Sequence, residues 1–491
     1  YKKWFSTQPQ LDGIPDFLPK IHFKTPGWFK QLKIFVKRDV LSKLANSQYM
    51  IINVLETPLL AFLLSYIIKY FNIDVSNRVG YTFMENSNIP VYLFMSVIVG
   101  VFVGLTVSAE EIIKDRKIQK RESFLNLSWS SYLMSKVAIL LVLSAVQAFM
   151  FVIVGNSILE VRGMYFEYWL VLFSAWFSSN MLGLVISDSF KTVVTIYILI
   201  PFLVIPQIIL SGVIVKYEKL NPKISSPSSI PFYGELIVAR WAYEALAVEQ
   251  FCNNPYEKPF YVFDEAMSIS DYKRNYWLKS LQNKVDFCSR NLGLPEKSEE
   301  VEDALTLLRN EIMHEMTSPQ GSKLTFSKYN QVSMAGVSPE LLDELKSYLE
   351  LVRKYYVKLY NKASSQKDAY ISSFQAAPGG QEAFVNLKRQ YYNESLTDFV
   401  RSTGEVERIT EYKGRLIQKI DPIFLYPDTK FVKAHFYSPV KPVFGKFAGT
   451  FWVNVAIIWI SNILLYLILY YRLLKRFLEQ FDRIGAEKEA N

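Results

Sequence analysis

The chain contains 491 residues, of which 50% are hydrophobic and 15% aromatic, and its formal net charge is +9. This composition excludes a disordered chain, a collagen and a small disulfide scaffold. The hydrophobic residues gather in 48–215 and 451–471, whereas residues 251–444 are polar throughout. The sequence therefore predicts a membrane protein with a large water-facing insert. The excess of basic residues flanks the membrane segments, which indicates topology and not a nucleic-acid partner.

Residues 26–45 alternate apolar and basic side chains with a helical period. Trp28, Phe29 and Phe35 are among the apolar residues, and Lys30 and Lys37 are among the basic ones. An apolar stripe opposite a basic face is typical of a helix that lies in the headgroup region of a bilayer. The alternative is an ordinary surface helix packed on a soluble core.

Six segments are long and apolar enough to cross a hydrocarbon core of ~30 Å, which takes ~20 helical residues. They are Gln48–Phe71, Ile89–Val107, Tyr132–Val154, Tyr168–Ile186, Val193–Val215 and Phe451–Tyr471. The fifth segment contains Pro201 and Pro206, which indicates a bent helix that is either mobile or statically kinked.

The distribution of basic residues predicts the orientation of these segments. Residues 1–47 carry more basic than acidic side chains, and the loop after the second segment is also basic. Its basic residues are Lys114, Arg116, Lys117, Lys120 and Arg121. Because basic loops stay in the cytoplasm, both termini are expected there and residues 251–444 outside. The start shows no charged segment before a short apolar core, so no signal peptide is expected. The composition favours a bacterial inner membrane.

The expected fold is an all-α membrane protein with an interfacial helix, six transmembrane helices and a large, mainly helical extracytoplasmic insert. Helical periodicity in the insert covers 270–291, 297–317, 339–363 and 380–402. Four regions follow from this pattern. They are a cytoplasmic and interfacial region at 1–47, spans 1–5 with a re-entrant outer segment at 48–250, the insert at 251–444, and span 6 with its tail at 445–491.

The two cysteines, Cys252 and Cys288, both lie in the insert. An oxidising exterior would permit a disulfide, provided that their Cα atoms approach within ~7 Å. The sequence leaves open whether they form this bridge or remain two buried thiols.

Motifs for catalysis are absent from the sequence. His314-Glu315 lacks a second histidine at the zinc-protease spacing, and no G-x-S-x-G or Walker A motif occurs. We therefore expect no catalytic residues and no metal site in this stretch, and any ATP hydrolysis should belong to another domain or subunit.

Two groups of charged residues are candidates for function. The loop between spans 2 and 3 is expected to be helical from Ala109 to about Phe124 and to face the cytoplasm. It is either a lever between these spans or a solvated loop that sets topology. Glu56 lies within the first span, where a carboxylate costs roughly 2.5–3.5 kcal/mol and requires a partner or a watery cavity. Lys37 and Arg38 are candidate partners, and a role in transport is the alternative.

Several local motifs resemble the membrane domain of G-subfamily ABC half-transporters and their bacterial relatives. The motif KQLKIFVKRD at Lys30–Asp39 is similar to the connecting helix of that family, and Ser131-Tyr132-Leu133 with Lys136 is similar to the start of its third span. Ala239–Leu246 resembles its Arg-Tyr-x-x-Glu-Ala-Leu stretch. The similarity covers about 26–250 and 445–478.

The resemblance implies roles for individual residues. The coupling helix, which contacts a nucleotide-binding domain, would contain Glu110, Asp115, Arg116, Lys117, Arg121 and Glu122. The substrate path would contain Phe102, Pro206, and a plug at Val213 and Ile214, where the family has paired leucines. The insert is several times longer than the last loop of the family.

The resemblance also implies partners. It predicts the membrane half of an ATP-driven exporter that moves lipid or other hydrophobic cargo through a cavity on the axis of a dimer. A nucleotide-binding domain, upstream in the same chain or on a separate subunit, would supply ATP and Mg²⁺, and a second copy or a paralogue would complete the cavity. A second hypothesis is a mechanical device that acts on envelope partners through its insert, and a channel or receptor is a third.

Overall fold

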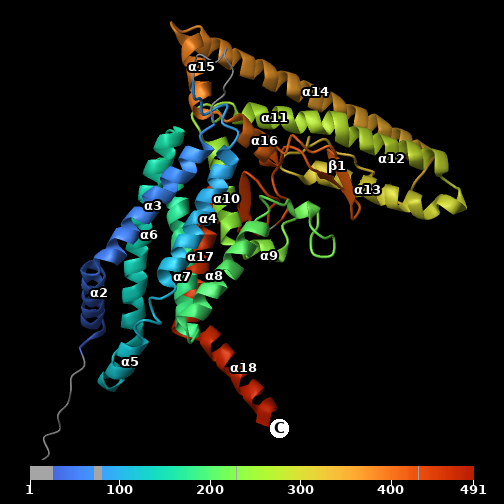
Figure 1. Ribbon diagram of the computed structural model, residues 1–491. Helices are drawn as coiled ribbons and strands as arrows, with labels where there is room; N and C mark the ends of the chain where they lie inside the picture. The colour runs from blue at the N-terminus through green and yellow to red at the C-terminus, as the bar shows by residue number, and fades with distance from the viewer. Residues whose placement is uncertain (1–25, 71–79, 228, 430, 491) are drawn as a thin grey trace, which may run out of the picture.

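The computed structural model describes residues 26–70, 80–227, 229–429 and 431–490, and shows that the chain is mostly helical. A bundle of apolar helices carries an elongated arm at one end, whereas α5 (Arg116–Glu122) and α18 (Leu473–Ala490) lie at the opposite end (Figure 1). The described strands form two antiparallel hairpins. The expected all-α class is thus confirmed at the level of helix content.

Six helices correspond to the predicted membrane segments. They are α3 (Ser47–Ile68), α4 (Ile89–Ser108), α6 (Trp129–Leu159), α7 (Tyr165–Ser189), α8 (Val193–Ile209) and α17 (Thr450–Tyr470). Within the described residues, five of them are long and apolar enough to cross a membrane, and α8 is shorter. Phe71, the predicted end of the first segment, lies outside the described residues.

The predicted extent of the fifth segment is wrong, because α8 ends at Ile209 and not at Val215. The chain turns at Gly212, whose φ of +78° favours glycine. A Cβ atom there would lie 2.4 Å from the ring of Tyr217. This contact brings the chain after α8 against the arm side of the bundle.

Helix α7 forms the centre of the bundle and packs closely on α4. Gly100 and Gly104 of α4 face Trp176, and a Cβ at Gly104 would lie 2.7 Å from the Trp176 carbonyl oxygen. Glycines four residues apart let two membrane helices approach at the backbone. Replacing either glycine would therefore separate α4 from α7.

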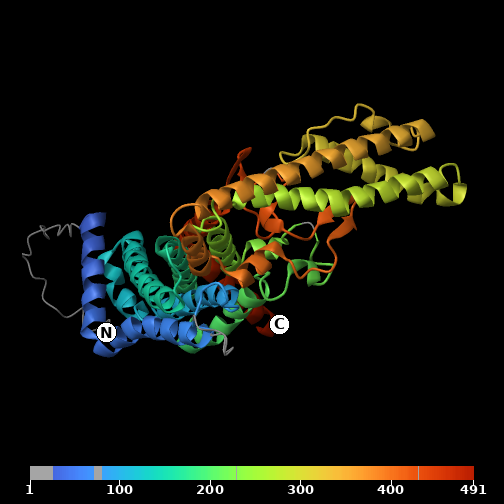
Figure 2. The same cartoon turned by 90° about the horizontal axis from the view of Figure 1, so that it is seen from above.

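Helix α2 (Trp28–Ala45) lies across the bundle, because Figure 2, which looks along the bundle, shows this helix lengthwise. Only Gln31 and Phe35 of α2 are buried, whereas Phe29 and Leu44 are exposed. The predicted helix is therefore present. Its exposed apolar residues fit a position at the surface of the bilayer, which stays a prediction.

The arm is built from helices of the predicted insert. It comprises α11 (Tyr261–Tyr272), a π-helical turn at Lys273–Trp277, α12 (Leu278–Asn291), α13 (Ser298–Thr317), α14 (Pro339–Gln375), and the hairpin β1 (Ile409–Tyr412) and β2 (Arg415–Gln418), in which Ile409 is opposite Gln418. These elements share a hydrophobic core that is separate from the core of the bundle. Tertiary packing of the amphipathic faces, predicted from their period, produces this second core.

The rest of the insert contacts both the arm and the bundle. It contains α15 (Gly380–Tyr391), α16 (Glu394–Arg401), and the hairpin β3 (Val440–Val443) and β4 (Lys446–Gly449). The predicted single helix at 380–402 is two helices, because the Asn393 side chain accepts the Leu396 N–H and begins α16. The amide of Asn393 also donates to the carbonyl oxygens of Phe83 and Asn86 at 2.7 and 2.9 Å, which ties α16 to the segment before α4.

The cysteines do not form a disulfide. Cys252 ends α10 (Val238–Cys252) and packs against the core of the bundle, whereas Cys288 is buried in the core of the arm. Of the two possibilities that the sequence left open, the structure therefore excludes the disulfide, since the two thiols belong to different hydrophobic cores.

Glu257, in the turn between α10 and α11, makes the stability of the fold dependent on pH. Burial, followed by the charge of Asp264, raises the pKa of this carboxyl from 4.5 to about 7. Between these values the folded chain holds a proton that the unfolded chain has released, so stability should fall as pH rises from about 4.5 to 7. Replacing Glu257 by Gln should remove this slope and stabilise the protein at pH 8 by on the order of 3 kcal/mol.

Thermal unfolding of Glu257→Gln and wild-type protein at pH 5 and 8 measures this effect. The exposed Glu382→Gln substitution is the matched control and should keep the wild-type slope. Equal pH dependence of Glu257→Gln and wild type would contradict the assignment.

Candidate coupling site

The segment between α4 and α6 is less helical than predicted. Residues 109–115 form turns, and only α5 continues as a regular helix. The hydroxyl of Ser187, near the end of α7, accepts the N–H groups of Ile112 and Ile113 at 3.1 Å. These two N–H groups therefore bond to a side chain instead of to the backbone of a helix, and they hold the turn against α7.

A cluster of charged residues lies buried where α2, the 109–115 turn and α6 meet. The centre is Lys136 of α6, whose side chain is 4% exposed. Its ammonium group lies 3.1 Å from Asp39 of α2, 3.1 Å from Glu111 and 3.0 Å from Asp115. Lys43 of α2 also pairs with Asp39 at 2.9 Å and with Glu111 at 2.8 Å. We call these five residues the charge cluster.

The electrostatics of the charge cluster favour ionised side chains. Burial by itself would raise the pKa of Asp39, but the positive charges of Lys136 and Lys43 outweigh burial and lower this pKa. Tyr132 of α6 donates its hydroxyl to Asp115 at 3.0 Å. A buried ion pair is held only when its remaining hydrogen-bonding capacity is also used, so the cluster depends on its precise geometry.

Further hydrogen bonds hold α2 against the start of α6. The indole N–H of Trp28 donates to the Ser130 hydroxyl at 2.8 Å, and the Gln31 side chain accepts the Ser128 N–H at 2.8 Å. Arg38 of α2 pairs with Glu122 at 2.8 Å. Arg38 therefore links α2 directly to α5.

The structure brings four of the six predicted coupling residues into contact with surrounding helices. Glu110 pairs with Lys114 and accepts the Tyr197 hydroxyl of α8 at 2.7 Å, and Arg116 donates to the carbonyl oxygens of Ser187 and Asp188 at 2.9 and 2.6 Å. Asp115 and Glu122 make the contacts given above.

The other two predicted coupling residues, Lys117 and Arg121, are exposed on α5. Within the described part of the chain, neither forms an ion pair. These two positive charges are therefore free to bind another protein.

The sequence did not predict the ion pairs that join Asp39, Lys43, Glu111 and Lys136. Lys136 and Asp39 belong to motifs noted for family resemblance, but no pairing was expected between them. A usable signal was the position of Lys136 in a predicted span, where an ionisable residue requires a partner.

Glu56 lies half-buried in α3, and neither Lys37 nor Arg38 is its partner. The expected salt bridge is wrong, because Arg38 pairs with Glu122 instead. Glu56 forms no ion pair within the described residues. Nearby in α3, the carbonyl oxygen of Asn53 accepts a hydrogen bond from Gln147 of α6 at 3.5 Å.

Two of the four predicted substrate-path residues, Phe102 and Ile214, are exposed, and the other two are half-buried. Phe102 of α4 is exposed, as are Phe202 and Ile205 of α8, and these two helices pack together. Pro206 lies in the same helix, half-buried. After α8, Val213 is half-buried and Ile214 is exposed.

A second buried charge cluster lies at the arm side of the bundle. Glu244 of α10 accepts from Arg240 at 3.0 Å, from Lys441 of β3 at 2.6 Å and from Asn454 of α17 at 2.9 Å. Arg240 also pairs with Glu235. Glu244 belongs to the Arg-Tyr-x-x-Glu-Ala-Leu resemblance, and the structure shows that it joins three separate segments.

Residues 30–251 match the family described as ABC-2 type transporter. These residues are an ABC-2 membrane domain. The expected resemblance to ABC transporter permeases is thus confirmed. No curated protein matches the chain.

The ABC-2 domain extends from α2 to the end of α10 and contains the whole coupling site. The arm begins with α11 at Tyr261, after the matched residues and a turn. The protein is therefore an integral membrane protein with a permease domain of an ABC transporter, which is a transport domain and not a catalytic one.

Proposed function

We propose that this chain is the membrane half of an ATP-driven exporter, in which a nucleotide-binding domain in the cytoplasm binds α5. The observation that carries the proposal is the charge cluster, which joins the 109–115 turn to α2 and α6. In the same segment, Arg116 joins the turn to α7 and Glu110 joins it to α8. Movement of α5 would thus reach four helices at once, α2, α6, α7 and α8.

The proposed cycle requires two states of the membrane domain. ATP must bind more tightly to one of them, because equal binding to both would shift no population. The ATP and Mg²⁺ would belong to the nucleotide-binding domain. In this arrangement both termini and α5 lie in the cytoplasm, and the arm lies outside. The position of α5 and α18 at the end opposite the arm in Figure 1 supports it.

The cargo is proposed to be a lipid or another hydrophobic molecule. The exposed apolar faces of α4 and α8 support this, because an apolar cavity selects apolar cargo. A second copy of the chain, or a paralogue, would cover these faces and form the cavity on a two-fold axis. Six spans, including the short α8, would come from each copy.

Reversing the two free charges of α5 tests the coupling. We expect Lys117→Glu with Arg121→Glu to reduce cargo transport at least tenfold, because the nucleotide-binding domain would lose two attractive contacts, while the protein still inserts and folds. ATP hydrolysis and transport of a labelled lipid are measured in proteoliposomes that contain the whole complex.

The charge-matched control is Lys354→Glu with Lys358→Glu, two exposed lysines of α14 in the arm. This control should transport normally. Normal transport by the Lys117→Glu and Arg121→Glu protein would exclude the proposed contact.

The alternative is a mechanical device that acts on envelope partners. The hydrogen bonds from Asn393 to the segment before α4 favour it, since they would pass movement of α4 into the insert. ATP-dependent lipid movement in proteoliposomes that lack envelope partners would support the exporter. An ATP-dependent change in the distance between spin labels on the arm and α4, without lipid movement, would support the device.

A further inference from the structure

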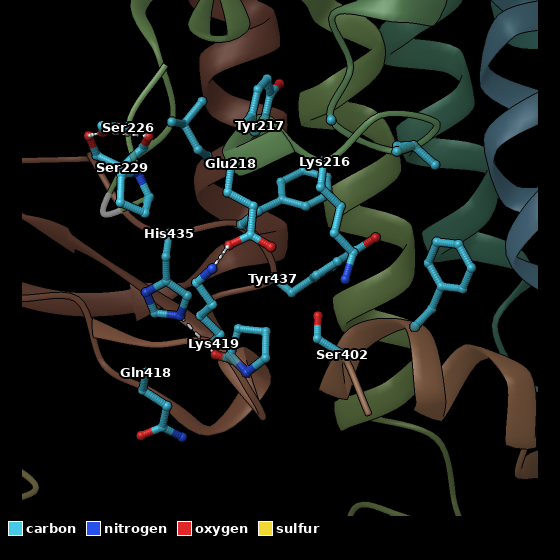
Figure 3. A pocket seen from close by; sticks show the side chains of 17 residues that line it. Lys216, Tyr217, Glu218, Ser226, Ser229, Ser402, Gln418, Lys419, His435 and Tyr437 are labelled. Atoms are coloured by element: carbon cyan, nitrogen blue, oxygen red, sulfur yellow. Dashed lines mark hydrogen bonds and ion pairs between the residues drawn. The ribbon is translucent and has the colours of Figure 1, made fainter. Parts of the chain in front are cut away.

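A recess extends from the end of α8 into the arm. It consists of two adjoining cavities of about 130 and 470 Å³. The residues that line both are Pro227, Ser229, Gln418, Pro422 and His435. The smaller cavity, shown in Figure 3, begins at Gly212 and Val213, directly after α8. The larger lies between α11, α13 and the β1–β2 hairpin.

The wall of the larger cavity combines charged and polar side chains with an aromatic and aliphatic part. It includes Tyr272, Trp277, Leu416, Leu425 and Tyr426. Tyr272 is only 3% exposed, and its hydroxyl has no hydrogen-bond partner within the described residues.

Each carboxylate of this wall has a hydrogen-bonding or ion-pair partner in the same wall, and Arg415 also lies 3.5 Å from Asp428. The pairs are Glu311 with Arg415, Glu315 with Lys273, and Asp428 with His314, each at 2.8 Å. The wall therefore offers little attraction to a cationic ligand.

Two lysines of the wall remain without a counter-ion. Lys413, in the turn between β1 and β2, and Lys433 are both exposed, and neither forms an ion pair within the described part of the chain. The charge that the recess offers to a ligand is therefore positive. An ammonium group binds a phosphate or a carboxylate as a point charge.

We propose that this recess binds an amphipathic molecule with an anionic head group, a phosphate or a carboxylate. The apolar part packs against the aromatic wall, and the head group contacts Lys413 and Lys433. The cavity volume lies within the ~300–1,000 Å³ typical of small-molecule sites. Because the recess begins at Val213, we assign it as the place that receives cargo from the membrane domain, a role that rests on the proposed export function.

Direct binding without ATP tests the site. The complete protein in phosphatidylcholine nanodiscs is titrated with radiolabelled oleoyl lysophosphatidic acid, with oleate and with oleoyl lysophosphatidylcholine. At least one of the two anionic probes should bind at least tenfold more tightly than the zwitterionic probe, and the tighter of the two identifies the head group as phosphate or carboxylate.

Charge reversal tests whether Lys413 and Lys433 bind the anionic head group. Lys413→Glu with Lys433→Glu should weaken anionic binding at least tenfold, and the neutral pair Lys413→Gln with Lys433→Gln should weaken it at least threefold. Both pairs should keep the wild-type unfolding temperature, because the lysines are exposed. Lys279→Glu with Lys446→Glu, two exposed lysines outside the recess, is the matched control and should bind normally.

Equal affinity for all three probes, or unchanged binding after either lysine exchange, would overturn the proposal. Since the assay contains no ATP, a failure of ATP-driven export would leave its result unchanged. Loss of the site and loss of the export function are therefore distinguishable.

Discussion

Replacing Lys136 by Met is expected to destabilise the protein by about 3–5 kcal/mol, as is usual when one member of a buried ion network is removed. Three carboxylates, Asp39, Glu111 and Asp115, would remain around Lys43 alone. Their repulsion would push α2 and the 109–115 turn away from α6. Thermal unfolding in nanodiscs measures the loss of stability.

The matched control is Lys117→Met, which removes the same charge from an exposed position on α5 and should change stability by about 0.5 kcal/mol or less. The double variant Lys136→Met with Glu111→Gln should recover part of the loss, because neighbouring residues are not additive. If Lys136→Met unfolded at the wild-type temperature, the cluster would not hold α2 in place.

Replacing Glu244 by Gln should have an effect of similar size, about 3–5 kcal/mol. Arg240 and Lys441 would remain buried with Glu235 as their one carboxylate. Because Glu244 joins α10 to β3 and α17, we expect the arm side of the bundle to open first. Hydrogen exchange of residues 238–252 and 440–454, together with the unfolding temperature, measures this.

The pH dependence gives an independent check. Burial lowers the pKa of Lys441 from 10.5 to about 8, although Glu244 opposes this shift. The unfolded chain thus binds more protons between pH 8 and 10.5, so this group makes stability rise with pH over that window. Lys441→Met should abolish the rise, whereas the exposed Lys446→Met should keep it. If the stability of Lys441→Met still rose between pH 8 and 10.5, a group other than Lys441 would be responsible for the rise.

Much of the helical architecture could be predicted from the sequence. The six apolar segments and the arm helices begin and end within a few residues of most predicted bounds, because long apolar runs and helical periods are local properties. Helix α14 continues to Gln375, beyond the predicted end at 363, and α11 begins at Tyr261, before the predicted start at 270. Two further exceptions have local causes that the pattern does not contain. The turn at Gly212 shortens α8, and the cap at Asn393 divides one predicted helix.

The sequence by itself determined the class of the protein, the extent of most of its apolar helices and the segment that carries its predicted coupling residues. Only the tertiary structure decided which charges meet. Lys136 pairs with Asp39, 97 positions away, and Arg38 pairs with Glu122 and not with Glu56. The separation of Cys252 from Cys288 was likewise decided by two distinct cores. The physical reason is that ion pairs and cores depend on distances across helices, and a residue pattern along one chain specifies only its own neighbours.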